Sequence, residues 1–155
     1  MLKSILCLFM FVAGGQLDAF KKEMTPLQTD IDAVVESTGA RVFSNSKATY
    51  LEGYGLIVVL EAMLEPTRNP LFSSAKSPAE VRTAVNQRLK SIQDKLSEFL
   101  KQRVTKTESV GTVESLTVIV HISNTNPAEV PDLLKQLVLT VKKDSPGQVA
   151  IRPYK

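Results

Sequence analysis

The chain has 155 residues, with 19 Lys and Arg against 16 Asp and Glu, so its formal net charge is +3. This small excess is spread along the chain and argues against the concentrated basic surface of a nucleic-acid-binding domain. Cys7 is the only cysteine and His121 the only histidine, which excludes an internal disulfide and a histidine-rich metal site; we expect neither a metal nor another cofactor.

Residues 1–15 have the composition of a secretory signal peptide. Lys3 gives a positive start, the run from Ile5 to Ala13 is almost wholly apolar, and small residues follow up to Gly15. This order predicts cleavage after Gly15, with a second candidate position after Ala19. The apolar run is shorter than the roughly 18 residues that span a bilayer, so no transmembrane span is expected. We expect export to the periplasm or the medium. An uncut signal would instead leave a membrane-tethered envelope component.

Cleavage at this position would leave a chain without cysteine that must be held together by its hydrophobic core. Residues 16–24 are polar with scattered apolar positions, and they are expected to form a mobile new N-terminus. Residues 25–155 are long enough for a single domain with a substantial core.

The first helix is predicted over residues 26–37. Thr25, Pro26 and Gln28 form a capping-box pattern with a proline at the first helical position. Gly39 is suited to end the helix. One apolar face follows at helical spacing, made of Leu27, Ile31, Val34 and Val35.

The next segment is rich in β-branched and aromatic residues, which are typical of strands. We predict strands near 40–44, 47–52 and 54–64, with a turn at Asn45 and Ser46 between the first two.

A second, longer helix is predicted to begin after Ser77, because Ser77 and Glu80 repeat the capping-box pattern more strongly. A single apolar stripe then runs along about seven turns. Its members are Val81, Val85, Leu89, Ile92, Leu96 and Phe99.

The rest of the chain alternates apolar and polar residues over 115–123, 135–143 and 148–152, which predicts two strands and a further short one. Residues 133–137 are compatible with either helix or strand. The sequence therefore predicts an α+β fold: a single domain with a mostly antiparallel sheet and two helices packed on one face, in the order α-β-β-β-α-β-β.

Three stretches carry a resemblance to a known group of proteins: "ATYLEGYGLIVVLEA" at 48–62, "ESLTVIVHI" at 114–122 and "KQLVLTVKK" at 135–143. Together with the long amphipathic helix, they resemble uncharacterised exported bacterial proteins with a similar Gly-aromatic-Gly entry to a strand. The resemblance implies an exported, single-domain protein. It implies no activity, cofactor or catalytic residue.

The pair Gly53 and Gly55 around Tyr54 looks most like a ligand loop. A dinucleotide-binding loop needs a third small residue three positions on and a helix after it. Here Val58 takes that position and a β-branched run follows, so the pair is predicted to mark a bend or a close backbone approach. Tyr50 and Tyr54 could line a groove, which makes Tyr50 and the Gly53–Gly55 segment the candidate ligand or partner surface.

Two functions compete. The favoured one is a non-catalytic exported module that binds another envelope protein or a polymer through a sheet edge or the helix-free face. The alternative is a small hydrolase that uses His121 with Ser44 or Ser73, because each serine precedes a lysine at the Ser-x-x-Lys spacing. A catalytic triad would require the histidine, a serine and a carboxylate to meet in one cleft.

Overall fold

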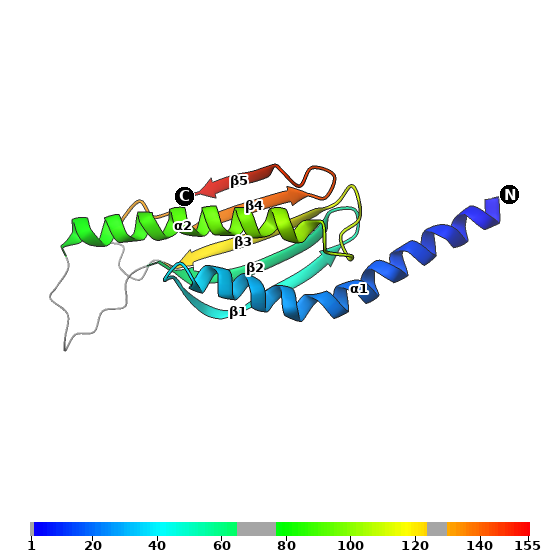
Figure 1. Cartoon of the computed structure of the whole chain (residues 1–155), viewed down its shortest axis with the longest axis horizontal. Helices are drawn as coiled ribbons and strands as arrows, with labels where there is room; N and C mark the ends of the chain where they lie inside the picture. The colour runs from blue at the N-terminus through cyan, green and yellow to red at the C-terminus, as the bar shows by residue number, and fades with distance from the viewer. Residues whose placement is uncertain (1, 65–76, 124–129) are drawn as a thin grey trace.

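The computed structural model of the chain describes residues 2–64, 77–123 and 130–155, with side chains described from Gly15 onward. The elements in these ranges are α1 (Leu2–Glu36), β1 (Arg41–Leu51), β2 (Gly55–Met63), α2 (Pro78–Val104), β3 (Ser115–Ser123), β4 (Gln136–Lys142) and β5 (Val149–Tyr154). They form a single sheet with two helices on it (Figure 1). The predicted α+β class is therefore confirmed.

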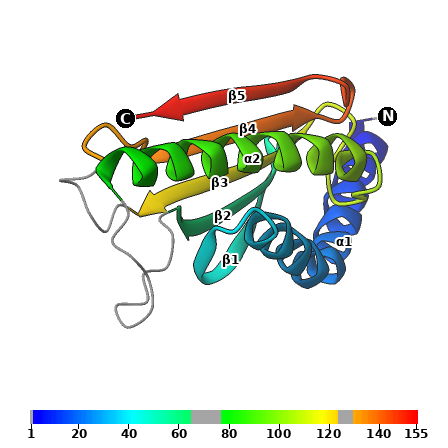
Figure 2. The same ribbon diagram turned by 60° about the vertical axis from the view of Figure 1, so that its left-hand side comes forward.

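The strands lie side by side in their sequence order, β1-β2-β3-β4-β5. Neighbouring strands pair antiparallel except β2 and β3, which pair parallel from Gly55 opposite Ser115 to Met63 opposite Ser123. A parallel pair needs a long crossover, and α2 supplies it. Figure 2 shows α2 crossing the sheet on the same side as α1.

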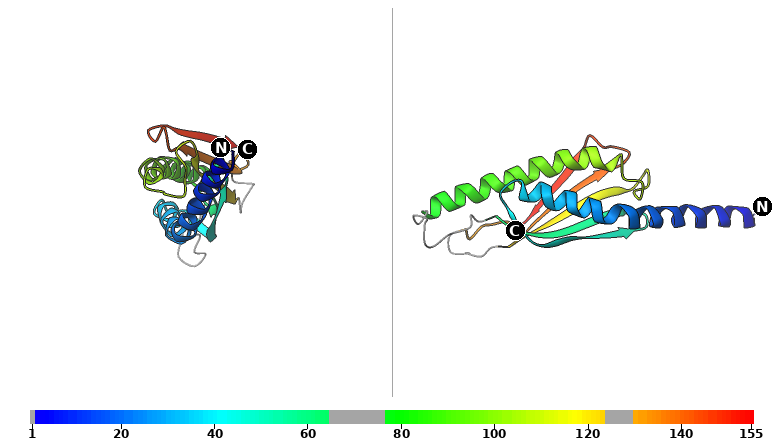
Figure 3. Two further views of the ribbon diagram at one scale, coloured as in Figure 1. Left: turned by 90° about the vertical axis from the view of Figure 1, so that its right-hand side faces the viewer. Right: turned by 60° about the horizontal axis from the view of Figure 1, so that its bottom comes forward.

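Both helices cover the same face of the sheet, and no helix of the described ranges lies on the other face (Figure 3). α1 packs mainly on β1, and α2 mainly on β4 and β5. The core lies between these layers because each strand turns alternate apolar side chains toward the helices. Its fully buried large residues include Leu27, Ile31, Leu56, Leu64, Ile92, Leu96, Leu100, Leu116, Leu137 and Leu139.

The region predicted as two short strands around a turn at Asn45 and Ser46 is one strand, β1, with two shifts of register. The irregular residues keep their hydrogen bonds through α1. The Ser46 N–H donates to both carboxylate oxygens of Asp32, at 3.3 and 3.2 Å, and the Gln28 side-chain amide donates to the Ser46 carbonyl. These contacts join distant residues, so the local sequence did not reveal them.

Two expectations about the first helix were wrong. α1 does not begin at Pro26 but runs through it, and the Gln28 amide bonds to Ser46 instead of reaching back to Thr25. An internal proline removes one helical hydrogen bond and bends the helix, and α1 changes direction partway along in Figure 1.

Residues 16–24, expected to be a mobile tail, are part of α1 and contact the domain. The Phe20 ring lies 6.4 Å from the Tyr50 ring. The Glu23 carboxylate accepts from the Glu108 N–H at 2.7 Å and from the Ser109 hydroxyl at 2.6 Å. The contacts of Phe20 and Glu23 hold this segment against the domain. Its polar composition suggested a mobile tail because these contacts join residues that are far apart in the sequence.

The second capping box is confirmed. Glu80 N–H donates to the Ser77 hydroxyl at 3.3 Å, while Ser77 N–H donates to the Glu80 carboxylate at 2.7 Å. The predicted apolar stripe of α2 faces the sheet, with Val81, Val85, Ile92 and Leu96 buried and Leu89 and Phe99 half-buried.

The ambiguous segment 133–137 is not helical; it enters β4 at Gln136. The predicted alternation of β4 is confirmed, with Leu137, Leu139 and Val141 fully buried, whereas β5 is exposed along nearly its whole length.

Candidate functional site

The Gly53-Tyr54-Gly55 segment is the tight connection between β1 and β2. The Tyr54 N–H donates to the Leu51 carbonyl at 3.0 Å, and both glycines have positive φ, 80° at Gly53 and 103° at Gly55. A Cβ atom on Gly55 would lie 2.2 Å from the Ser115 carbonyl oxygen. The segment is therefore both the predicted bend and a close backbone approach between β2 and β3.

This turn holds a carboxylate of the chain itself. Glu114 is only 5% exposed. Its oxygens accept from the Gly53 N–H at 2.9 Å, the Gly111 N–H at 2.7 Å and the Tyr50 hydroxyl at 2.9 Å. The Tyr50 hydroxyl also lies 2.9 Å from the Gln16 side-chain oxygen. We call Gln16, Tyr50, Gly53, Gly111 and Glu114 the Glu114 cluster.

The hydrogen bonds of the Glu114 cluster support the fold by joining the β1–β2 turn to the residues before β3. Burial raises the pKa of Tyr50 to about 12, and the hydrogen bond to Glu114 and the negative charges of Glu114 and Glu52 act in the same direction. Tyr50 is thus a firm proton donor and not a catalytic base. Tyr54, the remaining residue of the predicted ligand surface, is 76% exposed.

The structure does not assemble the predicted hydrolase site around Ser44. Ser44 pairs with Glu61 on β2, and Glu61 pairs with His121 on β3. The serine and the histidine are therefore two strands apart, about 10 Å between Cα atoms, with the acid between them. In the described part of the chain, no hydrogen bond or ion pair joins the His121 side chain to another residue. Ser73 lies outside the described residues.

Ser44 instead lines a hollow between α1 and β1, together with Asp32 and Glu36. His121 is exposed and lies on the helix-free face, because it alternates with the buried residues Val120 and Ile122.

The helix-free face carries a row of apolar side chains across its centre. The register places Val59, Ile119 and Val138 side by side on β2, β3 and β4, all half-buried. The same row ends in exposed cations at both edges of the sheet, Lys47 on β1 and Arg152 on β5.

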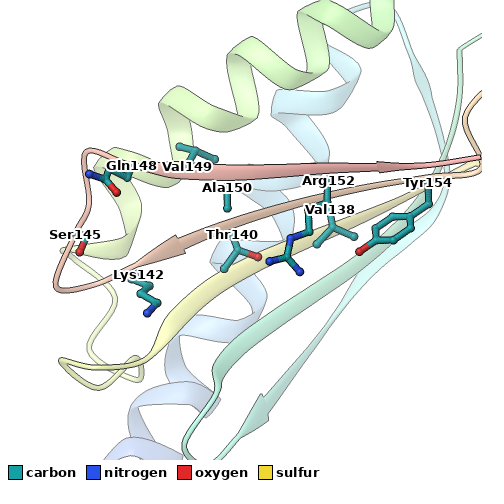
Figure 4. A pocket seen from close by; sticks show the side chains of 9 residues that line it. All are labelled: Val138, Thr140, Lys142, Ser145, Gln148, Val149, Ala150, Arg152 and Tyr154. Carbon is teal, nitrogen blue, oxygen red and sulfur yellow. The ribbon is translucent and has the colours of Figure 1, made fainter.

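The same face is hollowed between β4 and β5 (Figure 4). This β4–β5 hollow has a volume of about 550 Å³. It is lined by Val138, Thr140, Lys142, Ser145, Gln148, Val149, Ala150, Arg152 and Tyr154. Its floor is low because the small residues Thr140 and Ala150 face each other across the two strands.

Two cations flank the β4–β5 hollow without partners. Among the described residues, neither Lys142 nor Arg152 makes an ion pair or a side-chain hydrogen bond. The neighbouring Lys143 is different: its ammonium donates to the Thr107 and Val110 carbonyls, both at 2.7 Å. Lys143 is thus part of the fold, whereas Lys142 and Arg152 are available to a ligand.

The sequence reasoning missed Glu114, Lys142 and Arg152. Alternation along β4 and β5 indicated that Lys142 shares a face with Thr140, and Arg152 with Ala150. Only the register between the strands brings these pairs together.

Comparisons with protein-family models, with curated proteins and with solved structures find no match. No helix within the described residues has both the length and the apolar character needed to cross a membrane. Nor do three or more His, Cys, Asp or Glu side chains of the described ranges gather where they could hold a metal ion.

Proposed function

We propose that this protein is an exported, non-catalytic binding module that holds an acidic protein of the cell envelope on the helix-free face of its sheet. The observation that carries the proposal is the apolar row Val59–Ile119–Val138, which neither helix covers and which ends in the cations Lys47 and Arg152.

The composition of this face supports a binding role. The solvated face of an antiparallel sheet is ordinarily polar. Here the centre is apolar, and Ile57 on β2 extends the row toward the next level of the sheet. Contiguous apolar surface with a polar rim is typical of interaction sites.

The sheet edges are poorer candidates. At β1, two register shifts interrupt the edge, and Asp32 and Gln28 occupy the Ser46 backbone. At β5, the Tyr154 carbonyl faces the β4 side, where it accepts from the Lys135 N–H at 2.9 Å. Backbone groups of successive strand residues alternate in direction, so Pro153 faces the free edge and offers no donor. The register shifts of β1 and the proline of β5 both protect the sheet edges from the addition of another strand.

The positive charge of the helix-free face favours an acidic partner. Lys47, Lys142 and Arg152 lie on the helix-free face, to which the described strands contribute a single acidic residue, Glu61. A second copy of the chain would bring these like charges together, which is unfavourable. An acidic partner with an apolar centre complements the face.

Export is part of the proposal and rests on the signal-like composition of residues 1–15 and on the resemblance described above. Of the two candidate cleavage positions, the one after Gly15 is favoured. It retains Gln16 and with it the contact to the Tyr50 hydroxyl, whereas cleavage after Ala19 would remove that contact.

The test is a pull-down of the tagged chain from the envelope fraction of its own cells, with mass spectrometry of the partner and of the N-terminus. Ile119→Arg places a charge in the apolar row. Gln87→Arg adds the same charge on the exposed surface of α2, in the other layer. We expect a mature N-terminus at Gln16 and an acidic protein that is lost with Ile119→Arg but kept with Gln87→Arg.

Retention of the partner by a folded Ile119→Arg chain would refute the role of the helix-free face. An intact Met1 in the membrane fraction would show a tethered component instead of a released one. An anionic polymer in place of a protein would overturn the identity of the partner.

A further inference from the structure

We propose that the β4–β5 hollow binds the carboxylates of an extended acidic peptide segment, with Lys142 and Arg152 each contacting one acidic side chain. The inference rests on the proposed function, because it names the chemistry by which the helix-free face recognises its acidic partner.

The spacing of the two cations requires two acidic groups. Arg152 pairs with Val138, and Lys142 lies four positions further along β4. At about 3.4 Å per strand residue, these levels are about 14 Å apart. Side chains on a strand stand roughly perpendicular to the sheet, so one carboxylate spans only a fraction of this distance. Figure 4 shows Lys142 and Arg152 apart, with Thr140 between them.

An extended peptide has the matching repeat. Side chains four positions apart in such a chain project from the same side and are separated by the same distance as the strand levels of Arg152 and Lys142, because the rise per residue is the same. A peptide that runs along β4 and β5 would therefore place one carboxylate at Arg152 and one at Lys142. Arg152 has the planar guanidinium that pairs with a carboxylate through two parallel hydrogen bonds.

The remaining lining suits a peptide backbone. Ser145, Gln148 and Tyr154 bring polar groups to the rim, and Ala150 leaves the floor low. These groups can bond to the N–H and C=O groups of an extended chain, which has no internal partners for them.

The probe is a short Ser/Ala peptide with two glutamates four positions apart. Two comparison peptides carry either glutamines at the same positions or two adjacent glutamates. Binding to the purified full chain is followed by amide chemical shifts in a ¹⁵N-labelled sample. We expect the glutamate peptide to shift the amides of Thr140, Ala150 and Arg152, and the glutamine peptide to shift none of them.

Substitutions separate the hollow from general charge. Lys142→Gln and Arg152→Gln should each weaken binding roughly fivefold, and added salt should weaken it further. Lys106→Gln removes an exposed lysine outside the hollow and should leave the affinity unchanged. Ala150→Leu fills the floor without changing charge and should abolish binding, while the urea midpoint stays within error.

Several results would overturn the inference. These are no shifts at the hollow, equal binding of the adjacent-glutamate peptide, equal loss with Lys106→Gln, or full affinity of Ala150→Leu. Displacement of the peptide by inorganic phosphate at the peptide's own concentration would show a site for free anions. If the peptide fails but Ile119→Arg still loses the envelope partner, only this inference fails. If the peptide binds as expected but Ile119→Arg keeps the partner, the proposed function fails instead.

Discussion

The Glu114 cluster lies at the end of the sheet where the β4–β5 hollow begins, because Ser115, next to Glu114, pairs with Lys142. Both contain charged groups, but the two regions use them differently. The Glu114 carboxylate is buried and accepts three hydrogen bonds from its own chain. Lys142 and Arg152 are exposed and have no partner among the described residues.

The comparison separates a charged group that supports the fold, Glu114, from charged groups that are available for binding, Lys142 and Arg152. A buried carboxylate is costly unless hydrogen bonds compensate its lost hydration, so changes to the Glu114 cluster should lower the free energy of unfolding. An exposed cation keeps its hydration and contributes little to stability. Changes to the hollow should therefore affect binding alone.

The largest effect is expected from Gly55→Ala. The new Cβ would meet the Ser115 carbonyl, and φ is positive, so strain and collision act together. We expect the free energy of unfolding to fall by about 3–5 kcal/mol, measured by urea unfolding. Gly53→Ala is the matched control. Its φ is also positive but nothing lies within 4 Å of the added atom, so the loss should be only about 1 kcal/mol. Equal losses would show that the close approach is unimportant.

Glu114→Ala comes next. It leaves the Gly53 and Gly111 N–H groups and the Tyr50 hydroxyl without their acceptor, which should lower the free energy of unfolding by about 2–3 kcal/mol. Glu108→Ala, at an exposed position in the same loop, should change it by less than about 0.5 kcal/mol. A stable Glu114→Ala chain would mean that water replaces the carboxylate.

A smaller effect concerns Tyr50 and pH. Its pKa in the folded chain is about 12, above the ordinary value of 10.0, so the folded state holds the phenol proton more tightly than the unfolded state. This stabilisation is present below pH 10 and is lost as the pH rises from 10 toward 12. Tyr50→Phe should cost about 1 kcal/mol at neutral pH.

Urea midpoints between pH 9 and 12 check this prediction. The wild-type chain should lose more stability over this range than the Tyr50→Phe chain, because only the wild type has the phenol at this position. Parallel curves for the two chains would mean that the pKa of Tyr50 is the same in the folded and unfolded states.

The smallest effect is expected from the double change Lys142→Gln with Arg152→Gln. Both side chains are exposed and unpaired in the described structure, so the unfolding free energy should change by less than about 0.5 kcal/mol. Lys143→Gln is the control, since it removes hydrogen bonds to two carbonyls and should cost about 1–2 kcal/mol. A large loss from the double change would mean that the two cations serve the fold.

The sequence predicted correctly those elements that are marked by neighbouring residues, such as a capping box or a regular alternation. Ser77 and Glu80 marked the start of α2, and the alternation around Leu137 marked β4. The failures involve distant contacts. Pro26 looked like a helix start because its missing hydrogen bond is normally tolerated only there. The bulges of β1 looked like a turn because Asp32, on α1, satisfies the Ser46 N–H.

The candidate site was predictable only in outline. The helix-free face was expected to be a binding surface, and the apolar residue Val59 was already visible as part of a strand. The β4–β5 hollow was not predictable, because it depends on which residue of β5 lies opposite Thr140. Glu114 escaped notice because a single glutamate before a strand has no local signature.

The parallel pairing of β2 with β3 also governs how the chain can fold. The β1–β2 and β4–β5 hairpins join segments close in sequence, and such hairpins form within microseconds. The pairing of β2 with β3 must wait until the 27 residues of α2 have crossed the sheet, and such non-local closure is slow. Until then β2, the most apolar strand of the N-terminal half, has an open edge. A nascent chain therefore remains an incomplete sheet until β3 is available.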